Sequence, residues 1–179
     1  KMITVNHSNQ LDVWLITYNR KNNSFYTYLI DKNGINTPNI QKRNTLDSIS
    51  LVDVVFNLDY DIKHKKLINC SRDNFSFEIY NFDNTTGQID IKNAIILPSY
   101  NFNAEDTSSI DSTQFFIPYS AILSEDGSKF YGSCYRKSIL QYDLTLGDVS
   151  SIIASRCVVA DSTWGDGSFG AIRRAPDDK

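Results

Sequence analysis

Three stretches of this chain repeat one design, an alternating strand that ends in Asp and is followed within a few residues by Gly. The copies cover residues 25–34, 77–87 and 138–147. Alternation with period two predicts a half-buried strand. An Asp at its end accepts the backbone hydrogen bonds that start a turn, and the Gly supplies the positive φ that completes it. Asp31, Asp83 and Asp143 are therefore predicted to close three equivalent strands.

Each copy lies in a longer unit that contains three more predicted strands. Two strands precede the repeated one and a fourth follows it, with short polar turns between them. The first strands are 2–5, 51–56 and 119–123, with turns at 7–10, 59–61 and 124–128; the second strands are 11–18, 66–71 and 129–135; the fourth strands lie near 39–40, at 94–97 and at 151–154. Four short antiparallel strands per unit are typical of the blades of a β-propeller.

The predicted fold class is all-β, with propeller-type blades of four antiparallel strands. Blade 1 covers approximately 1–45, blade 2 approximately 46–100 and blade 3 approximately 115–160, with a loop at 101–114; 161–179 form a partial fourth blade. The partial blade rests on the similarity of 169–172 to 119–122. Three blades and one strand make an incomplete ring, since propellers have about four blades or more. The chain is therefore expected to be a segment of a longer polypeptide with further blades; a β-sandwich or open meander is the alternative.

Composition supports a strand-rich and turn-rich chain. Among the 179 residues are 17 Asn and 18 Asp but only 3 Glu and 7 Ala, while Tyr and Phe number 10 each. Asn and Asp favour turns and aromatic residues favour strands. Composition therefore points away from a helical bundle.

Charge and hydropathy argue against a nucleic-acid partner and a membrane span, and the cysteine count limits disulfide pairing. The net charge is −3, and the densest basic run, 63–66, follows Asp59 and Asp61, so it is predicted to be a solvated hairpin turn rather than a nucleic-acid patch. No apolar run approaches the length of a membrane span. Three cysteines, Cys70, Cys134 and Cys157, cannot all pair within one chain. We expect Cys70 and Cys134 to be buried free thiols, and the sequence leaves their disulfide status open.

Residues 161–167 form the predicted loop that offers the most candidate groups for binding a ligand. Asp161 and Asp166 offer carboxylate oxygens of the kind that bind Ca²⁺, and Trp164 offers a stacking surface for a sugar or peptide. The alternative is that these residues form a turn between blades and that Trp164 packs between blades. We expect no resident cofactor. Neither His7 nor His64 lies in a motif for nucleophilic catalysis, so no catalytic residue is assigned. Trp14 is predicted to pack in a core or between blades rather than to contact a ligand.

One family resemblance covers nearly the whole chain, in order. The segments that carry it are 12–17 with 25–29 and Gly34, then 80–87, then 123–131 with 139–144. They resemble the WD-repeat-like β-propeller region of secreted Bacteroidota proteins of the gliding-motility-associated type, which commonly carry a type IX secretion sorting domain. The resemblance implies a secreted or cell-surface protein. The chain departs from the pattern at 57–61 and at 177–178, where Asp-Gly turns would be usual.

These observations predict a non-catalytic binding or scaffold module that contacts a protein or glycan, or that spaces other domains. An enzyme is not expected. The rival hypothesis is a lactonase-like or lyase-like propeller with a site in a central channel. The predicted inner strands carry Val52, Val54, Ala121 and Ile122, whereas such a site needs polar or metal-binding groups.

Overall fold

The computed structural model describes residues 1–43, 57–72, 74–100, 116–135, 138–161 and 169–174. The chain divides into two compact units. Unit 1 consists of Lys1–Asn69 and Ile79–Ile95, and unit 2 of Cys70–Glu78 and Ile96–Lys179. Each unit is described by itself below.

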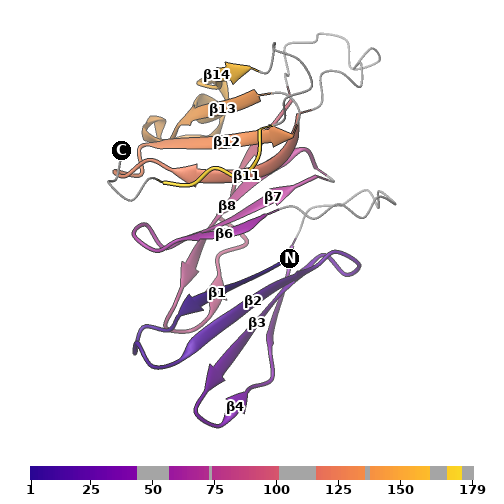
Figure 1. The fold of residues 1–179 in the computed structure, drawn as a ribbon, viewed down its shortest axis with the longest axis vertical. Coiled ribbons are helices and arrows are strands. Elements are labelled where there is room, and N and C mark those ends of the chain that lie inside the picture. The colour runs from indigo at the N-terminus through magenta and orange to yellow at the C-terminus, as the bar shows by residue number, and fades with distance from the viewer. Residues whose placement is uncertain (44–56, 73, 101–115, 136–137, 162–168, 175–179) are drawn as a thin grey trace. The chain divides into compact units, whose positions relative to one another are not determined.

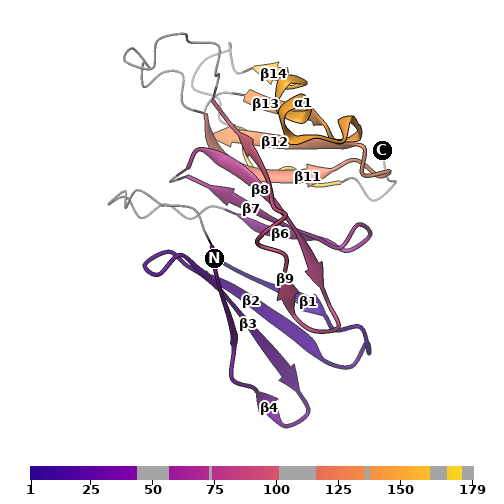
Figure 2. The same ribbon diagram turned by 180° about the vertical axis from the view of Figure 1, so that it is seen from behind.

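The described strands form three antiparallel sheets of four to five strands (Figures 1 and 2). Sheet 1 has the order β1-β2-β3-β4, with β5 also on β3; sheet 2 has the order β10-β8-β7-β6, with β9 on β8; sheet 3 has the order β11-β12-β13-β14. Sheet 1 contains β1 (Met2–Asn6), β2 (Val13–Asn19), β3 (Ser24–Asp31), β4 (Gly34–Ile35) and β5 (Asn39–Lys42). Sheet 2 contains β6 (Leu58–Asp61), β7 (Lys66–Ser71), β8 (Ser76–Asp83), β9 (Gln88–Ile89) and β10 (Ile95–Pro98). Sheet 3 contains β11 (Ile117–Leu123), β12 (Lys129–Tyr135), β13 (Ser138–Asp143) and β14 (Cys157–Asp161). The prediction of an all-β chain of antiparallel sheets is confirmed.

The repeated strand ends as its sequence predicts. β3, β8 and β13 end at Asp31, Asp83 and Asp143. Each carboxylate accepts a hydrogen bond from the backbone N–H two residues on, at 2.6, 2.9 and 3.0 Å. Because these bonds favour the charged carboxylate, they hold the pKa of each Asp below its ordinary value; for Asp83 the Thr86 hydroxyl contributes most and for Asp143 the Lys129 ammonium does.

The last strand of sheet 3 differs from its prediction. The sequence predicts a strand at 151–154, but these residues belong to a short helix, α1 (Val149–Ala154), which follows a 3-10 helix, η3 (Leu144–Leu146). The cause is capping, because the Asp148 side chain accepts a hydrogen bond from Ser151 N at 2.9 Å and so starts the helix. The fourth strand is β14, which pairs with β13.

The first strand of sheet 2 also differs. The sequence predicts a turn at 59–61, but these residues lie in β6, which pairs with β7 from Leu58↔Asn69 to Asp61↔Lys66. The turn lies at 62–65, where the Asp61 carboxylate accepts a hydrogen bond from His64 N at 2.8 Å. The basic run 63–66 therefore does lie at a hairpin turn. The predicted strand 51–56 and the predicted loop 101–114 lie outside the described residues, as do the departures at 177–178.

The segment predicted to open a fourth blade is not a strand in its described part, 169–174. It nevertheless contacts sheet 3 within unit 2. Ser133 Oγ donates to the carbonyl oxygen of Gly170 at 2.7 Å, and Ile172 N donates to Ser120 Oγ at 3.3 Å. Ser120 and Ser133 are cross-strand partners, so these two bonds tie the segment to one face of β11 and β12.

The core of unit 1 lies between sheet 1 and the part of sheet 2 that belongs to this unit. Phe25 and Tyr80 meet edge to face with ring centroids 5.3 Å apart, and Tyr60 and Phe82 do so at 5.7 Å. Such aromatic pairs add to the free energy of area burial. The buried residues of this core are Val5, Trp14, Ile16, Phe25, Leu58, Leu67, Tyr80, Phe82 and Ile89. Trp14 is thus a core residue, as predicted.

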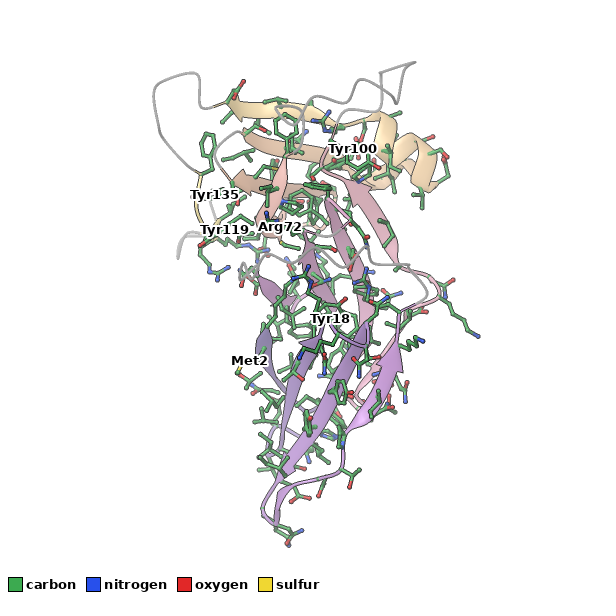
Figure 3. The ribbon with its side chains drawn as sticks, turned by 90° about the vertical axis from the view of Figure 1, so that its right-hand side faces the viewer. Met2, Tyr18, Arg72, Tyr100, Tyr119 and Tyr135 are labelled. Atoms are coloured by element: carbon green, nitrogen blue, oxygen red, sulfur yellow. The ribbon has the colours of Figure 1, made fainter. Side chains whose placement is uncertain are left out.

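Unit 2 has its own aromatic core on sheet 3. Phe77 and Phe130 lie 5.2 Å apart, and Phe130 and Tyr142 6.1 Å apart. Cys70 and Cys134 are buried free thiols, as expected, and Cys157 is exposed. On the surface of this unit Tyr119 and Tyr135 stack side by side with centroids 6.4 Å apart (Figure 3).

Candidate binding site

Two turns that are far apart in sequence meet in unit 1. The turn after β1 contains residues 7–12, and the turn after β8 contains residues 84–87. Ser8 N donates to the carbonyl oxygen of Asn84 at 3.1 Å, and Trp14 Nε1 donates to the same oxygen at 2.9 Å. These bonds join the two turns into one rigid corner of the unit.

The imidazole of His7 adds a second link between the turns. Its Nε2 lies 3.1 Å from the carbonyl oxygen of Thr85, and its Nδ1 accepts a hydrogen bond from Asn9 N at 3.0 Å. A carbonyl oxygen only accepts, so the tautomer with a proton on Nε2 satisfies both contacts. The ring also lies against Trp14, with centroids 5.6 Å apart. His7 is therefore a structural residue of this corner.

The second turn has its shape because of Asp83 and Gly87. Asp83 Oδ2 accepts from Thr86 Oγ1 at 2.7 Å, and the Asp83 carbonyl accepts from Gly87 N at 2.8 Å. Gly87 has φ +72°, which a residue with a side chain rarely adopts. A Cβ at this position would lie 2.7 Å from Trp14 Cζ3, so only glycine lets the indole lie this close.

A pocket of about 280 Å³ opens beside this corner, between β1 and β6. Of its lining residues, Val5 is 4% exposed and Ile62 is 73% exposed. The lining residues are Ile3, Thr4, Val5, Asn6, Gln10, Tyr60, Ile62 and Asn84. All of them belong to unit 1, so the pocket is complete within that unit.

The polar side chains of the pocket are largely uncommitted. Among the described residues, the hydroxyls of Thr4 and Tyr60 and the amides of Asn6 and Gln10 make no side-chain hydrogen bond, and Asn84 Nδ2 makes a long one of 3.4 Å to the carbonyl of Asn6. An amide offers both donors and an acceptor, and a hydroxyl does the same with one oxygen. By the alternation of β1, the Thr4 and Asn6 side chains lie on the face opposite Ile3 and Val5, so the polar side chains left at the pocket are those of Gln10, Tyr60 and Asn84.

The backbone of β1 adds to this lining. Two backbone bonds flank β1: Tyr18 N of β2 donates to the carbonyl of Lys1 at 3.2 Å, and His7 N donates to the carbonyl of Asp12, the residue before β2, at 2.9 Å. With the register Met2↔Thr17 to Asn6↔Val13, the alternation of an antiparallel ladder directs the N–H and C=O groups of Thr4 and Asn6 away from β2. β1 is the edge strand of sheet 1, so these groups face the pocket side.

The pocket carries no formal charge. None of its eight lining residues is a carboxylate, an amine or a guanidinium. Burial, with a smaller effect of the neighbouring Asp61 carboxylate, raises the pKa of the Tyr60 hydroxyl above its ordinary value. Tyr60 thus keeps its proton and can donate it in a hydrogen bond at any physiological pH.

The site residues suggested by the sequence lie elsewhere. Asp161 ends β14, opposite Ser138 on β13, and is exposed. Trp164 and Asp166 lie outside the described residues, so their role as ligands or as a turn between blades stays a prediction. No group of three or more His, Cys, Asp or Glu residues that would hold a metal occurs in the described segments.

Little in the sequence indicates this pocket. Asn6, Gln10 and Asn84 fall in or beside turns, where Asn and Gln have an ordinary structural explanation. One signal is visible only in the backbone, where Gln10 adopts φ +61° although it is not glycine. Such conformations recur at functional positions.

The fold defines the class of this chain as an all-β protein of three antiparallel sheets. Neither a protein-family model nor a curated protein matches it. In the segments that it describes, the structure holds no helix with the length and apolarity that crossing a bilayer requires.

Proposed function

We propose that this chain is a non-catalytic binding or scaffold module built from β-propeller-type blades. The observation that carries the proposal is one packing device that occurs in both units. In unit 1 the indole of Trp14 lies over Gly87, and in unit 2 the ring of Phe77 lies over Gly132. In each case an aromatic side chain of a sheet strand meets a glycine, which is Gly87 in the turn between β8 and β9 for Trp14 and Gly132 in β12 for Phe77. Propellers are built from repeated antiparallel sheets of about four strands, and close packing of an aromatic ring on glycine in each unit fits such a stack.

Further blades of the same polypeptide are the partners that this design favours. The face of sheet 1 opposite the core carries a row of cross-strand neighbours, Met2, Thr17, Tyr26 and Ile40. Met2 is 72% exposed and lies on the outside of unit 1 in Figure 3, and Tyr26 stacks on Tyr28 with ring centroids 6.4 Å apart. Of this row, Met2 and Ile40 are exposed apolar residues, which favours a contact surface on this face. The core-facing side of sheet 1 already packs against sheet 2 within unit 1. The outer face of sheet 1 is therefore suited to a further sheet.

The proposed setting is the cell surface or the secreted fraction, and it rests on the resemblance to secreted Bacteroidota propellers. In that setting the module contacts a protein or glycan, or spaces other domains. The rival proposal, a lactonase-like or lyase-like enzyme, has less support, because the pocket described above is lined by amides, hydroxyls and aliphatic groups. General acid–base chemistry requires titratable groups within hydrogen-bond reach of the reacting atoms.

Two measurements on the natural protein test this proposal. Purified protein is assayed for lactone hydrolysis and for elimination from uronate polysaccharides, with its Ca²⁺ and Zn²⁺ content measured alongside. We expect no turnover above buffer. Intact cells are then labelled with a membrane-impermeant biotin ester, and we expect the protein among the labelled products. Turnover accompanied by a stoichiometric metal would overturn the proposal in favour of the enzyme, and protection from the label would overturn the surface setting.

A further inference from the structure

The hairpin between β3 and β4 contains the dipeptide Asn33–Gly34, in which a glycine directly follows an asparagine. Every other asparagine of the sequence precedes a residue that carries a side chain. The backbone nitrogen of the next residue can attack the side-chain amide of an asparagine, and the product is a five-membered succinimide ring. Glycine has no Cβ that would shield this nitrogen or restrict the backbone rotation that ring closure requires. Asn33 therefore has the most reactive neighbour that an asparagine can have.

The structure leaves this dipeptide accessible. Asn33 and Gly34 are both exposed, and a Cβ at Gly34 would meet no atom of the described residues within 4 Å. β4 lies at the edge of sheet 1 (Figure 1) and is held to β3 by two residue pairs, Ile30↔Ile35 and Asp31↔Gly34. A short edge strand of this kind opens locally at little cost in free energy. Neither the rotation of the Gly34 peptide nor the access of water is blocked.

A second turn of the chain has a similar dipeptide but an unreactive side chain. Gly127 follows Asp126 and has φ +73°. Ring closure at a carboxyl group must expel water and needs the protonated acid, because a carboxylate repels the attacking nitrogen. The Ser124 hydroxyl at 2.7 Å and the N–H of Ser128 at 3.0 Å hold the pKa of Asp126 far below its ordinary value. Asp126 therefore stays ionised at neutral pH, whereas the Asn33 amide is neutral.

We propose that Asn33 is a site of spontaneous deamidation, a covalent modification for which the chain itself supplies the nucleophile. The Gly34 nitrogen forms a bond to Cγ of Asn33, the Cγ–Nδ2 bond breaks, and ammonia leaves with the proton of the Gly34 nitrogen. Water then opens the ring at one of its two carbonyls. Opening at the side-chain carbonyl gives aspartate, and opening at the backbone carbonyl gives isoaspartate. Water is the only co-reactant.

Either product places a new carboxylate beside Asp31. The Asn33 N–H at 2.6 Å and the Asn36 amide at 3.2 Å donate to the Asp31 carboxylate, and the Asn33 amide adds a smaller contribution to its lowered pKa. A carboxylate in place of the Asn33 amide removes a donor and repels Asp31. Isoaspartate also adds a main-chain carbon to the turn, so that Asp31 and Gly34 lose their register. We therefore expect β4 to detach from β3 in the modified chain.

The test follows the purified, folded chain during storage in neutral and mildly alkaline buffer, with peptide mapping by mass spectrometry. The peptide with Asn33 should gain the mass that separates a hydroxyl from an amino group, and it should do so before any other asparagine peptide. The rate should rise with pH, because the deprotonated Gly34 nitrogen is the nucleophile. A methyltransferase specific for isoaspartate should label this peptide and leave the peptide with Asp126 unlabelled.

Variants assign the reaction to the Gly34 nitrogen. Gly34→Ala should slow the conversion at least about tenfold, which corresponds to about 1.4 kcal/mol of activation free energy. Asn33→Gln keeps the glycine but requires a six-membered ring, and it should stop the conversion over the same period; it serves if Gly34→Ala does not fold. Asn22→Gln removes another exposed asparagine from the neighbouring hairpin and is the matched control, which should react at the parent rate.

Amide hydrogen exchange measures the structural consequence. In the modified chain the Asn36 N–H, which donates to the carbonyl of Leu29 at 2.9 Å, should lose protection, while the pairing of β2 with β3 persists. Earlier deamidation at another asparagine would overturn the inference, as would equal rates in the parent and Gly34→Ala chains. So would an absence of isoaspartate from the folded chain under conditions in which the urea-unfolded chain forms it.

Discussion

The indole of Trp14 lies directly over Gly87, so that a Cβ on Gly87 would fall 2.7 Å from Trp14 Cζ3 and 2.8 Å from Cη2. Trp14 lies in β2 of sheet 1, and Gly87 lies in the turn that joins β8 to β9 of sheet 2, within the same unit. Trp14 Nε1 donates at the same time to the carbonyl of Asn84, three residues before Gly87. One tryptophan therefore joins the core of unit 1 to the turn that borders the pocket.

Replacement of Gly87 by alanine should destabilise unit 1 by about 2–4 kcal/mol, since overpacking and a left-handed backbone both contribute. Urea unfolding measures the loss. Gly147→Ala is the control, because Gly147 has a similar φ of +79° but a Cβ there would meet no atom within 4 Å; its ψ of −41° is also unfavourable for alanine, so we expect a loss of about 1–2 kcal/mol from backbone strain alone. Equal losses of unfolding free energy in the two variants would show that the Trp14 indole moves aside without destabilising unit 1.

Gly132→Ala separates packing from backbone strain. Gly132 has no positive φ, and its Cβ would lie 2.3 Å from Phe77 Cζ. We expect a loss of about 1–3 kcal/mol from overpacking. Phe77→Leu in the same chain should recover part of the loss, and a double-mutant cycle measures the coupling. Strict additivity of the two changes would contradict the contact.

Removal of the Tyr142 hydroxyl from the core of unit 2 should lower the free energy of unfolding by a measurable amount. Tyr142 Oη donates to the carbonyl of Pro98, and both residues are buried. Burial raises the pKa of Tyr142 well above its usual range. Tyr142→Phe leaves the carbonyl unpaired and should cost about 1–2 kcal/mol in urea unfolding. Tyr28→Phe, at a half-exposed position, should cost less than about 0.5 kcal/mol; a similar cost for both would argue that the bond to Pro98 contributes nothing.

Acid should weaken the protein through its strand-ending aspartates. Hydrogen bonds and Lys129 lower the pKa of Asp143 to about 2, below the value near 3.9 of an unfolded chain. A carboxylate with a depressed folded pKa contributes stability that is present above pH about 4 and is lost as the pH falls toward about 2. The urea midpoint should therefore fall across that range. Asp143→Asn should flatten the slope, and an unchanged slope would exclude Asp143 as a source.

Alkylation should distinguish the three thiols. Cys157 is exposed, whereas Cys70 and Cys134 are buried, and burial raises the pKa of the Cys134 thiol well above its usual value. The thiolate is the reactive form, so iodoacetamide should add one label to the folded chain and three in urea, as read by mass spectrometry. Cys157→Ser should leave the folded chain unlabelled. Rapid labelling at two or more sites in the folded chain would contradict the packing of unit 2.

Local sequence alone was sufficient for the repeated strand and its turn. Asp31, Asp83 and Asp143 end their strands as predicted, because an Asx turn needs only a carboxylate and the backbone two residues on. The prediction failed where two local signals competed. Residues 151–154 have strand propensity, but Asp148 supplies a helix cap, and α1 forms instead.

The tertiary structure decided everything about the candidate site. Ser8 and Asn84 are separated by more than seventy positions, and their hydrogen bond forms only because the turns after β1 and β8 come together in unit 1. The uncommitted amides of Asn6 and Gln10 look in sequence like ordinary turn residues, since periodicity and propensity report on neighbours along the chain. The sequence by itself determined that the chain forms antiparallel strands with Asp-anchored turns. Which of those turns meet, and what pocket they enclose, depends on contacts between distant segments.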